Sequence, residues 1–466
     1  LGFLEKRDND GAEPVFDVLL MNAGASDLPK ETPESQKLPE TEKVSLQPSI
    51  QIDGANTVVP EAKRPPLFPL KTLPQVSQWT TKRGGGLHLL DASLRGIGQV
   101  FFCNSPVSGA MFLLAVLVSD LKMAALLVLA VASATAFAKA MEFDSGLLAA
   151  GIWGYNSALL GCALSVFSWG SNYPPHTETL STVFLLGLGV MGGACMTVIV
   201  TGAVARLLVP QGITPLTFPF QLVTWVWLLG AQQWGHVTAR SSPLPKLQVN
   251  MYTNVTAAVQ GTAAVEYGAP TPFQLQVYDP VSILLAAFSG IAQTFLVPQW
   301  YCGLIMLLGI GLCSMISAAW ALIGSLVGCI VAMGLGVNPQ DIYFGLHGYN
   351  SCLVGMALGG FFLVQRGCKV NVVALMGIVA AEVVTTATSS AFSPVGLPAL
   401  TWPFTVITWL MILATMGIPS ITPVATPSLT TAEDHRKSAE IATIRITMTP
   451  SMEVVKEVRK VKSETI

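Results

Sequence analysis

Long apolar stretches separated by short polar ones fill most of the chain after residue 86. The stretch LHLLDASLRGIGQVFF reads as a helix that ends at Asn104-Ser105-Pro106. Apolar segments follow near 107–119, 122–139, 145–168, 180–206 and 216–236, and again near 281–296, 300–314, 316–337, 342–365, 370–392 and 401–419. A membrane-spanning helix needs about 20 mostly apolar residues. The pattern therefore predicts an all-α polytopic membrane protein.

The polar stretches divide the chain into five parts. The first is rich in Pro, Glu, Lys, Ser and Asp without apolar periodicity, which is typical of disorder. The predicted parts are a disordered cytosolic N-terminal tail (1–86), a first membrane repeat (87–236), an extracellular linker (237–278), a second membrane repeat (279–420) and a cytosolic C-terminal tail (421–466). The linker contains Asn254-Val-Thr, an acceptor sequence for N-glycosylation.

The second membrane part repeats the first. GIWGYNSALLGCALSVF (151–167) and GLHGYNSCLVGMALGGF (345–361) are identical at ten of seventeen positions, with an offset of 194 residues. LTFPF at 216–220 returns as LTWPF at 400–404, now offset by 184, so the loops between the motifs differ in length. Motifs that recur in the same order predict a duplication.

Each half reads as five spanning helices plus one half-spanning helix, and an odd number of spans inverts the second half in the membrane. The basic residues agree with this topology, because Lys139, Arg206, Arg366 and Lys369 all fall on inner loops if both termini are cytoplasmic. Asn254 then lies outside, where glycosylation occurs. We therefore expect two inverted repeats around a pseudo-twofold pore, in a multi-pass plasma-membrane glycoprotein.

Composition narrows the function further. The chain is 52% hydrophobic and 11% charged, against about a quarter charged in soluble proteins, and its net charge of −2 gives no reason to expect a nucleic acid partner. The eight Cys residues form no C-x-x-C pair, and His347 has no partner at metal-ligand spacing. We expect no cofactor and no bound metal.

Each half carries the same uncharged polar groups. They are a Gln (Gln99, Gln293), a Tyr with a Leu four residues later (Tyr155 and Leu159, Tyr349 and Leu353), and a Thr before x-Pro-Phe (Thr217, Thr401). The Tyr and Leu share a helix face and make a flat apolar wall. Amide, hydroxyl and free carbonyl groups suit a small neutral polar solute and offer no counter-charge to an ion. Ordinary helix packing remains the alternative reading of these residues.

The motifs LRGIGQVFFCNSPVSG, GIWGYNSALLG, ITPLTFPF, IYFGLHGYNSCLVG and VGLPALTWPF resemble those of the urea transporter family over residues 87–420. The resemblance implies passive, channel-like conduction of urea, with urea analogues and water as further candidate solutes. It also implies a homotrimer in the lipid bilayer, with one pore in each protomer. One urea site would comprise Gln99, Phe102, Tyr155 and Leu159, and the other Gln293, Leu296, Tyr349 and Leu353, with Thr217 and Thr401 between them.

The second site departs from the pattern. Leu296 stands where Phe102 stands in the first half, and VPQWYCG replaces CNSPVSG. Phe295, Trp300 or Tyr301 would have to complete the flat wall there.

Two other functions are considered. An ion-coupled secondary transporter of a small neutral polar solute would need an ionisable group near the midplane, and Glu382 is the sequence's candidate. A membrane enzyme would need a nucleophile with a base or a set of metal ligands, and no such arrangement is visible. The sequence favours the urea channel and a protein that is not an enzyme.

Overall fold

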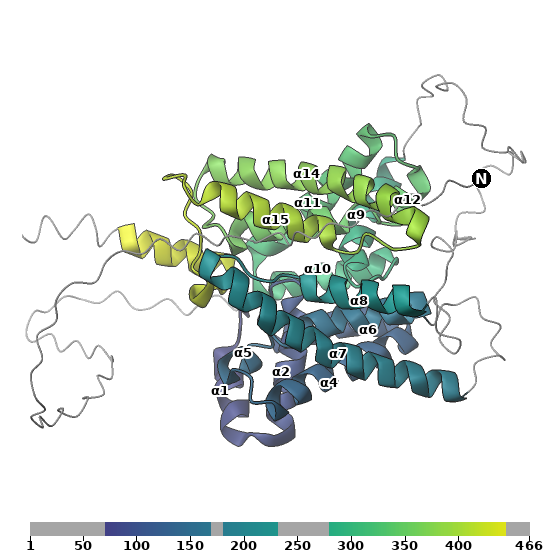
Figure 1. The fold of residues 1–466 in the computed structure, drawn as a ribbon. Helices are drawn as coiled ribbons and strands as arrows, with labels where there is room; N and C mark the ends of the chain where they lie inside the picture. The colour runs from purple at the N-terminus through teal and green to yellow at the C-terminus, as the bar shows by residue number, and fades with distance from the viewer. Residues whose placement is uncertain (1–69, 169–179, 232–278, 444–466) are drawn as a thin grey trace, which may run out of the picture. The chain divides into compact units, whose positions relative to one another are not determined.

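The computed structural model describes residues 70–168, 180–231 and 279–443, which form helices joined by short turns (Figure 1). In the first half the helices are α1 (Pro74–Arg83), α2 (Gly85–Gln99), α3 (Pro106–Ser119), α4 (Leu121–Ala140), α5 (Ser145–Ala149), α6 (Tyr155–Ser168), α7 (Leu180–Leu208) and α8 (Phe218–Ala231). In the second half they are α9 (Pro280–Gln293), α10 (Trp300–Cys313), α11 (Met315–Gly334), α12 (Pro339–Tyr343), α13 (Tyr349–Met356), α14 (Cys368–Phe392) and α15 (Trp402–Thr415). Within these ranges the one β-type pairing is a bridge between Leu363 and Pro423.

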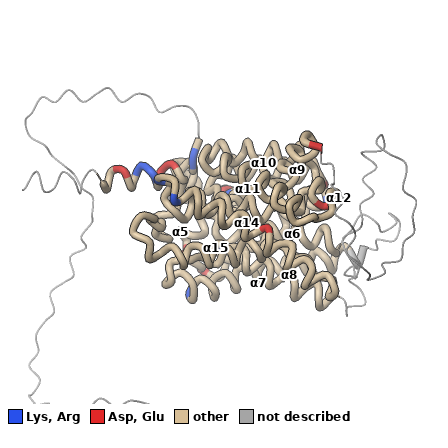
Figure 2. Tube along the Cα trace, turned by 90° about the horizontal axis from the view of Figure 1, so that it is seen from above, with Lys and Arg blue, Asp and Glu red and all other residues tan. Residues whose placement is uncertain are grey.

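The helices have the length and polarity that a membrane requires. Among the described residues, α4, α7, α11 and α14 are long and apolar enough to span it, and α3, α6, α8, α9, α10 and α15 are shorter apolar helices. Few charged residues lie along the helical bundle, whereas the short helix near the C-terminus carries both signs (Figure 2). The prediction of an all-α polytopic membrane protein is confirmed at this level.

Helices in the two halves begin with the same local chemistry. Asp120 accepts hydrogen bonds from the backbone N–H groups at the start of α4, and Ser314, 194 residues later, accepts one at the start of α11. Asp144 and Asn338 cap α5 and α12 in the same way. A capping oxygen satisfies N–H groups that the first helical turn leaves unpaired, so these polar residues fix where each helix starts.

Unusual backbone conformations also recur at the motif positions. Phe102 has φ 57° and Leu296 has φ 59°, 194 residues apart. Leu216 and Leu400 both have φ 50°, at the offset of 184. Bulky residues seldom adopt positive φ because of steric strain. Four such residues at the two offsets of the sequence repeat mean that the chain turns in the same way at both copies of each motif.

Small residues allow the close approach of neighbouring helices. A Cβ atom on Gly161 of α6 would lie 2.6 Å from the backbone oxygen of Leu126 in α4. At the offset of 194, a Cβ on Gly355 of α13 would lie 2.7 Å from the backbone oxygen of Trp320 in α11. Any larger side chain would force these helices apart, so the two glycines hold the motif helices against α4 and α11.

Three boundaries differ from the sequence-based expectation. The apolar segment 145–168 is broken into α5 and α6 by a turn at Gly151, where φ is 76°, and the segment 342–365 is broken between α12 and α13 at Gly345, where φ is 84°. The expected disordered tail ended at residue 86, but Pro74–Arg83 forms helix α1. Only Thr80 of α1 is buried, because polar contacts with α2 rather than an apolar face hold the helix in place. The sequence therefore carried no apolar periodicity to reveal it.

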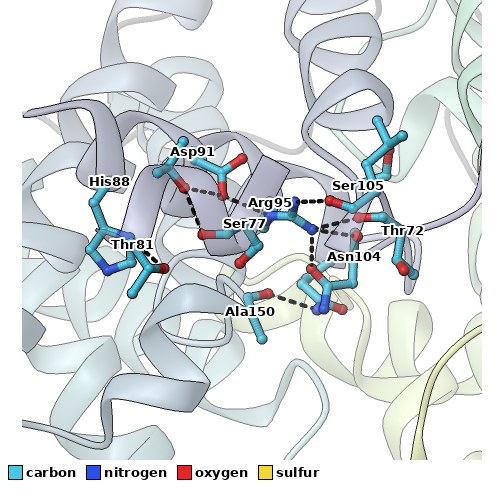
Figure 3. Close-up of polar contacts among 12 residues, drawn as sticks. Thr72, Ser77, Thr81, His88, Asp91, Arg95, Asn104, Ser105 and Ala150 are labelled. Carbon is cyan, nitrogen blue, oxygen red and sulfur yellow. Dashed lines mark hydrogen bonds and ion pairs between the residues drawn. The ribbon is translucent and has the colours of Figure 1, made fainter. Parts of the chain in front are cut away.

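Thr80 and Thr81 of α1 bond to Asp91 and His88 of α2, and Arg95 of α2 holds the segment just before α1 (Figure 3). Its side chain is buried and forms an ion pair with Asp91 at 2.9 Å. The guanidinium also donates to the backbone oxygens of Thr72 and Leu73, at 2.8 and 3.1 Å, and to the backbone and side-chain oxygens of Asn104. The residues just before α1 and the loop before α3 are thus fixed to the same point of α2.

The linker 237–278 and Asn254 lie outside the described residues.

Candidate permeation site

The two predicted Gln residues end equivalent helices and make equivalent bonds. Gln99, the last residue of α2, donates its side-chain N–H to the backbone oxygen of Ala150 at 2.9 Å. Gln293, the last residue of α9, donates to the backbone oxygen of Phe344 at 3.0 Å. Both acceptors lie just before the GYNS motif of their own half. Each Gln is therefore fixed beside the start of the helix that carries the Tyr and the Leu.

The Tyr hydroxyls find partners next to the predicted Thr residues. The Tyr155 hydroxyl donates to the backbone oxygen of Leu216 at 2.6 Å, one residue before Thr217. In the second half the Tyr349 hydroxyl donates to the backbone oxygen of Leu400 at 2.8 Å. Leu159 and Leu353 are almost fully buried behind them. Each Tyr is thus tied to the residue that precedes the central Thr of its half.

Thr217 and Thr401 come together although 184 residues separate them. Thr401 Oγ1 donates to Thr217 Oγ1 at 2.8 Å, and both side chains are buried. Two residues that the sequence did not single out complete the group. Gln221 Nε2 lies 2.9 to 3.1 Å from the hydroxyl oxygens of Thr217, Thr401 and Thr405. We call Thr217, Gln221, Thr401 and Thr405 the central cluster.

The sequence held a signal for these two additional residues. Gln221 lies four residues after Thr217 in α8, and Thr405 lies four residues after Thr401 in α15. Residues at this spacing share a helix face. A polar residue at the same register in both helices could therefore have been assigned to the centre.

The Asn residues of the two GYNS motifs, for which the sequence predicted no separate role, hold the central helices in place. Asn156 accepts from the backbone N–H of Phe220 at 3.2 Å and donates to the hydroxyl of Thr201. Asn350 accepts from the backbone N–H of Phe404 at 3.2 Å and donates to the hydroxyl of Thr385. Each Asn thereby satisfies a backbone N–H in the first turn of α8 or α15.

Phe102 and Leu296 occupy different surroundings despite their matched backbone. Phe102 stacks on Phe361, with ring centroids 4.6 Å apart, and lies 6.1 Å from the ring of Phe404 in α15. Phe102 of the first half therefore packs against rings from the second half. Leu296 is half-buried and packs against the apolar core.

The three candidates for completing the second wall make ring contacts with one another or with first-half residues. Phe295 is fully buried and packs against the rings of Phe101 and Phe112. Trp300 and Tyr301 contact each other, and their exposed fractions are 42% and 39%. Their ring contacts thus give no support to a substitute aromatic wall at this position.

His347 and Glu382 form a buried pair beside the second GYNS motif. Their side chains lie 2.5 Å apart, from His347 Nδ1 to Glu382 Oε1, with Glu382 fully buried in α14. The acid that the sequence offered to an ion-coupled mechanism is thus bonded to a histidine. Within the described ranges, no group of three His, Cys, Asp or Glu side chains is arranged to hold a metal ion.

A cavity of about 290 Å³ opens next to the first Gln. It is lined by α1, α2, α5 and the loop before α3, and its residues include Ser77, Gln78, Arg95, Asn104 and Ala150. Ala150 also accepts the hydrogen bond from Gln99. The cavity therefore lies beside the carbonyl group that Gln99 contacts. Figure 3 shows the polar contacts of two of its lining residues, Arg95 and Asn104.

Fold and site together define a polytopic helical membrane protein with duplicated motif residues gathered around an uncharged polar centre. A family model described as "Urea transporter" matches residues 90–416, and the chain belongs to that family. It is 27% identical to "Urea transporter 1" of sheep (Ovis aries) and of goat (Capra hircus), and 26% identical to that of mouse. Each comparison covers 362 residues, or 78% of this chain and 86% of the relative. Membership supports urea transport, and the named relatives are transporters.

Proposed function

We propose that this protein is a passive urea channel that conducts urea down its concentration gradient through a pore between two inverted repeats. The observation that carries the proposal is the central cluster. Thr217 and Thr401, one from each half, bond directly to each other, and the residue before each accepts a hydrogen bond from the Tyr of its own half. The motifs of both halves thereby meet at one uncharged cluster.

The inverted arrangement is supported by the matched halves. The Gln, Tyr and Asn bonds recur at the offsets of 194 and 184 residues, and so do the positive φ values. The equivalent helices α5 and α12 lie toward opposite ends of the helical bundle in both views (Figures 1 and 2). Equivalent elements at opposite ends are expected when the second half is inverted. A site at the repeat interface is then the usual arrangement for such transporters.

Urea is suited to this set of groups because it is small, flat and neutral, with one acceptor and four N–H donors. We propose that the aromatic rings and Leu159 and Leu353 contact its faces. Amide and hydroxyl groups of the cluster replace the water that urea sheds. The uncharged centre gives an ion no compensation for its lost hydration. The ion-coupled alternative is not favoured, since Glu382 is bonded to His347.

The test is urea flux into proteoliposomes that contain the purified full chain. Flux should saturate weakly, carry no current and persist when Na⁺ and proton gradients are dissipated. Collapse of urea flux on dissipating the gradients would instead support the ion-coupled transporter. The double variant Thr217→Val, Thr401→Val should slow urea roughly 5- to 150-fold, which corresponds to about 1–3 kcal/mol for one unpaired buried group. Wild-type flux through this variant at equal protein incorporation would exclude the hydroxyls from permeation.

We further propose a homotrimer in the plasma membrane, with a pore in each protomer, cytoplasmic termini and Asn254 outside. Crosslinking in native membranes tests the oligomer. Glycosidase should increase the gel mobility of the wild type and leave Asn254→Gln unchanged. Labelling of a cysteine beside residue 254 only after permeabilisation would reverse the topology.

A further inference from the structure

Gln221 distinguishes the two halves at the centre of the protein. It lies one helical turn after Thr217 in α8, and its equivalent in α15 is Thr405. Gln221 is fully buried, as is Thr405. The central cluster thus contains three hydroxyls and a single amide, and the amide comes from the first half alone.

The nitrogen of this amide already has more acceptors than hydrogens. Gln221 Nε2 carries two hydrogens and lies 3.1, 3.0 and 2.9 Å from the hydroxyl oxygens of Thr217, Thr401 and Thr405. The hydroxyls also bond to one another, and Thr405 can donate to the backbone oxygen of Thr401 at 3.2 Å. The nitrogen and the three hydroxyls therefore satisfy one another.

The oxygen of the same amide is not part of this set of hydrogen bonds. Gln221 Oε1 is buried and has no hydrogen-bond partner among the described residues. A buried carbonyl oxygen without a partner is unfavourable, and such groups are uncommon in folded proteins. Any N–H group that reached this oxygen would remove the penalty.

Other partnerless polar atoms lie along the same helices. The hydroxyls of Thr224 in α8 and Thr408 in α15, one turn beyond the cluster, are buried and also lack partners among the described residues. Phe218 contacts Trp409, and Trp225 contacts Trp402, so the two helices run antiparallel here. Unpaired polar atoms therefore occur on both helices, on either side of the cluster.

We propose that Gln221 is a specificity-determining residue for urea, whose amide oxygen accepts an N–H of the solute at the central cluster. Because the amide nitrogen lies among the three hydroxyls, the amide oxygen points away from them. Acetamide, which has a methyl group in place of one amino group, can bring an N–H to this oxygen in one orientation only. With its methyl group toward the oxygen it leaves the oxygen unpaired, so it passes more slowly than urea, which pairs in either orientation. Sites built around a buried hydrogen-bonding group reject analogues that lack its partner. The inference rests on the proposed urea conduction.

The experiment compares urea with acetamide, which has a methyl group where urea has a second amino group. Both fluxes are measured in proteoliposomes for the wild type and for Gln221→Met, which keeps the side-chain length but removes the amide. Urea permeability should fall roughly 5- to 150-fold, the range expected for one lost partner of a buried N–H. The urea-to-acetamide ratio should fall severalfold, because a thioether cannot tell an amino group from a methyl group.

Thr405→Val is the matched control, because it removes one partner of the amide nitrogen and leaves the amide oxygen in place. Its urea-to-acetamide ratio should stay within about twofold of the wild type, since the acceptor that sets the ratio remains. Gln221→Asn withdraws the oxygen by one methylene group and should lower the ratio. It also serves as the test variant if Gln221→Met does not fold.

The outcomes separate the inference from the function on which it rests. A wild type without urea flux overturns the proposed channel. Urea flux in the wild type together with an unchanged urea-to-acetamide ratio in the Gln221 variants overturns the role of Gln221 alone. An equal loss of both fluxes in Gln221→Met also overturns the role of Gln221, because that result indicates a packing defect and not a loss of selectivity.

Discussion

The buried pair of His347 and Glu382 gives a prediction that the repeat itself can test. In the first half the equivalent residues are Trp153 and Val198, both buried. Trp153 Nε1 lies 3.4 Å from the backbone oxygen of Asp144, so this half anchors the turn before its GYNS motif without a charged partner. The second half anchors the same turn by bonding His347 to α14.

The cost of breaking the pair follows from its burial. Glu382 is 0% exposed, His347 is its bonding partner at 2.5 Å, and the second carboxyl oxygen has no partner among the described residues. His347→Trp alone therefore leaves a buried carboxyl group with none. Removing one member of a buried ion pair typically costs about 3–5 kcal/mol. We expect an apparent Tm lower by roughly 5–15 °C.

The double variant His347→Trp, Glu382→Val carries the residues of the first half and leaves no acid behind. It should recover most of the lost stability, whereas Glu382→Val alone should cost less than His347→Trp, because it leaves no buried carboxyl group without a partner. Thermal unfolding in detergent, followed by tryptophan fluorescence or by loss of monodispersity, measures all four proteins. This reasoning would be refuted if His347→Trp alone were as stable as the wild type. It would also be refuted if the double variant were no more stable than His347→Trp.

Contacts away from this pair give three further expected outcomes. Tyr349→Phe removes a hydroxyl whose carbonyl acceptor keeps an amide partner, so proteoliposome assays should show urea flux reduced less than about fivefold. Arg95→Met should release α1 and speed its proteolysis, while the double variant with Asp91→Leu should be more stable than Arg95→Met alone. Burial raises the pKa of Asp434, but hydrogen bonds, chiefly from Lys71, outweigh it and hold the pKa below its usual value. The contact between Asp434 and Lys71 should thus persist at neutral pH and weaken only as the pH falls below about 4. A pH titration of the distance between spin labels beside the two residues measures this loss, and Asp434→Asn should abolish the pH dependence.

The sequence alone determined the membrane class, the order of the apolar helices, the duplication and the family resemblance. These features are local or are repeated in the same order, so periodicity and motif comparison are enough to find them. The positions of Gln99, Tyr155, Thr217 and their equivalents were also legible, because each recurs at a fixed offset. The extent of α1 was not, because polar contacts with α2, and the bonds of Arg95 to the residues just before α1, hold that helix in place rather than an apolar face.

Only the tertiary structure decided which of these residues meet. Thr217 and Thr401 are 184 residues apart, and no local pattern indicates that their hydroxyls bond to each other. The shared register marked Gln221 and Thr405 as candidates, but only the crossing of α8 and α15 brought Gln221 within reach of three hydroxyls from both halves. Likewise, Glu382 read as a lone acid until α14 packed beside the turn that holds His347. Hydrogen bonds between distant segments depend on how helices pack, and that packing is a property of the whole bundle rather than of any one stretch of the chain.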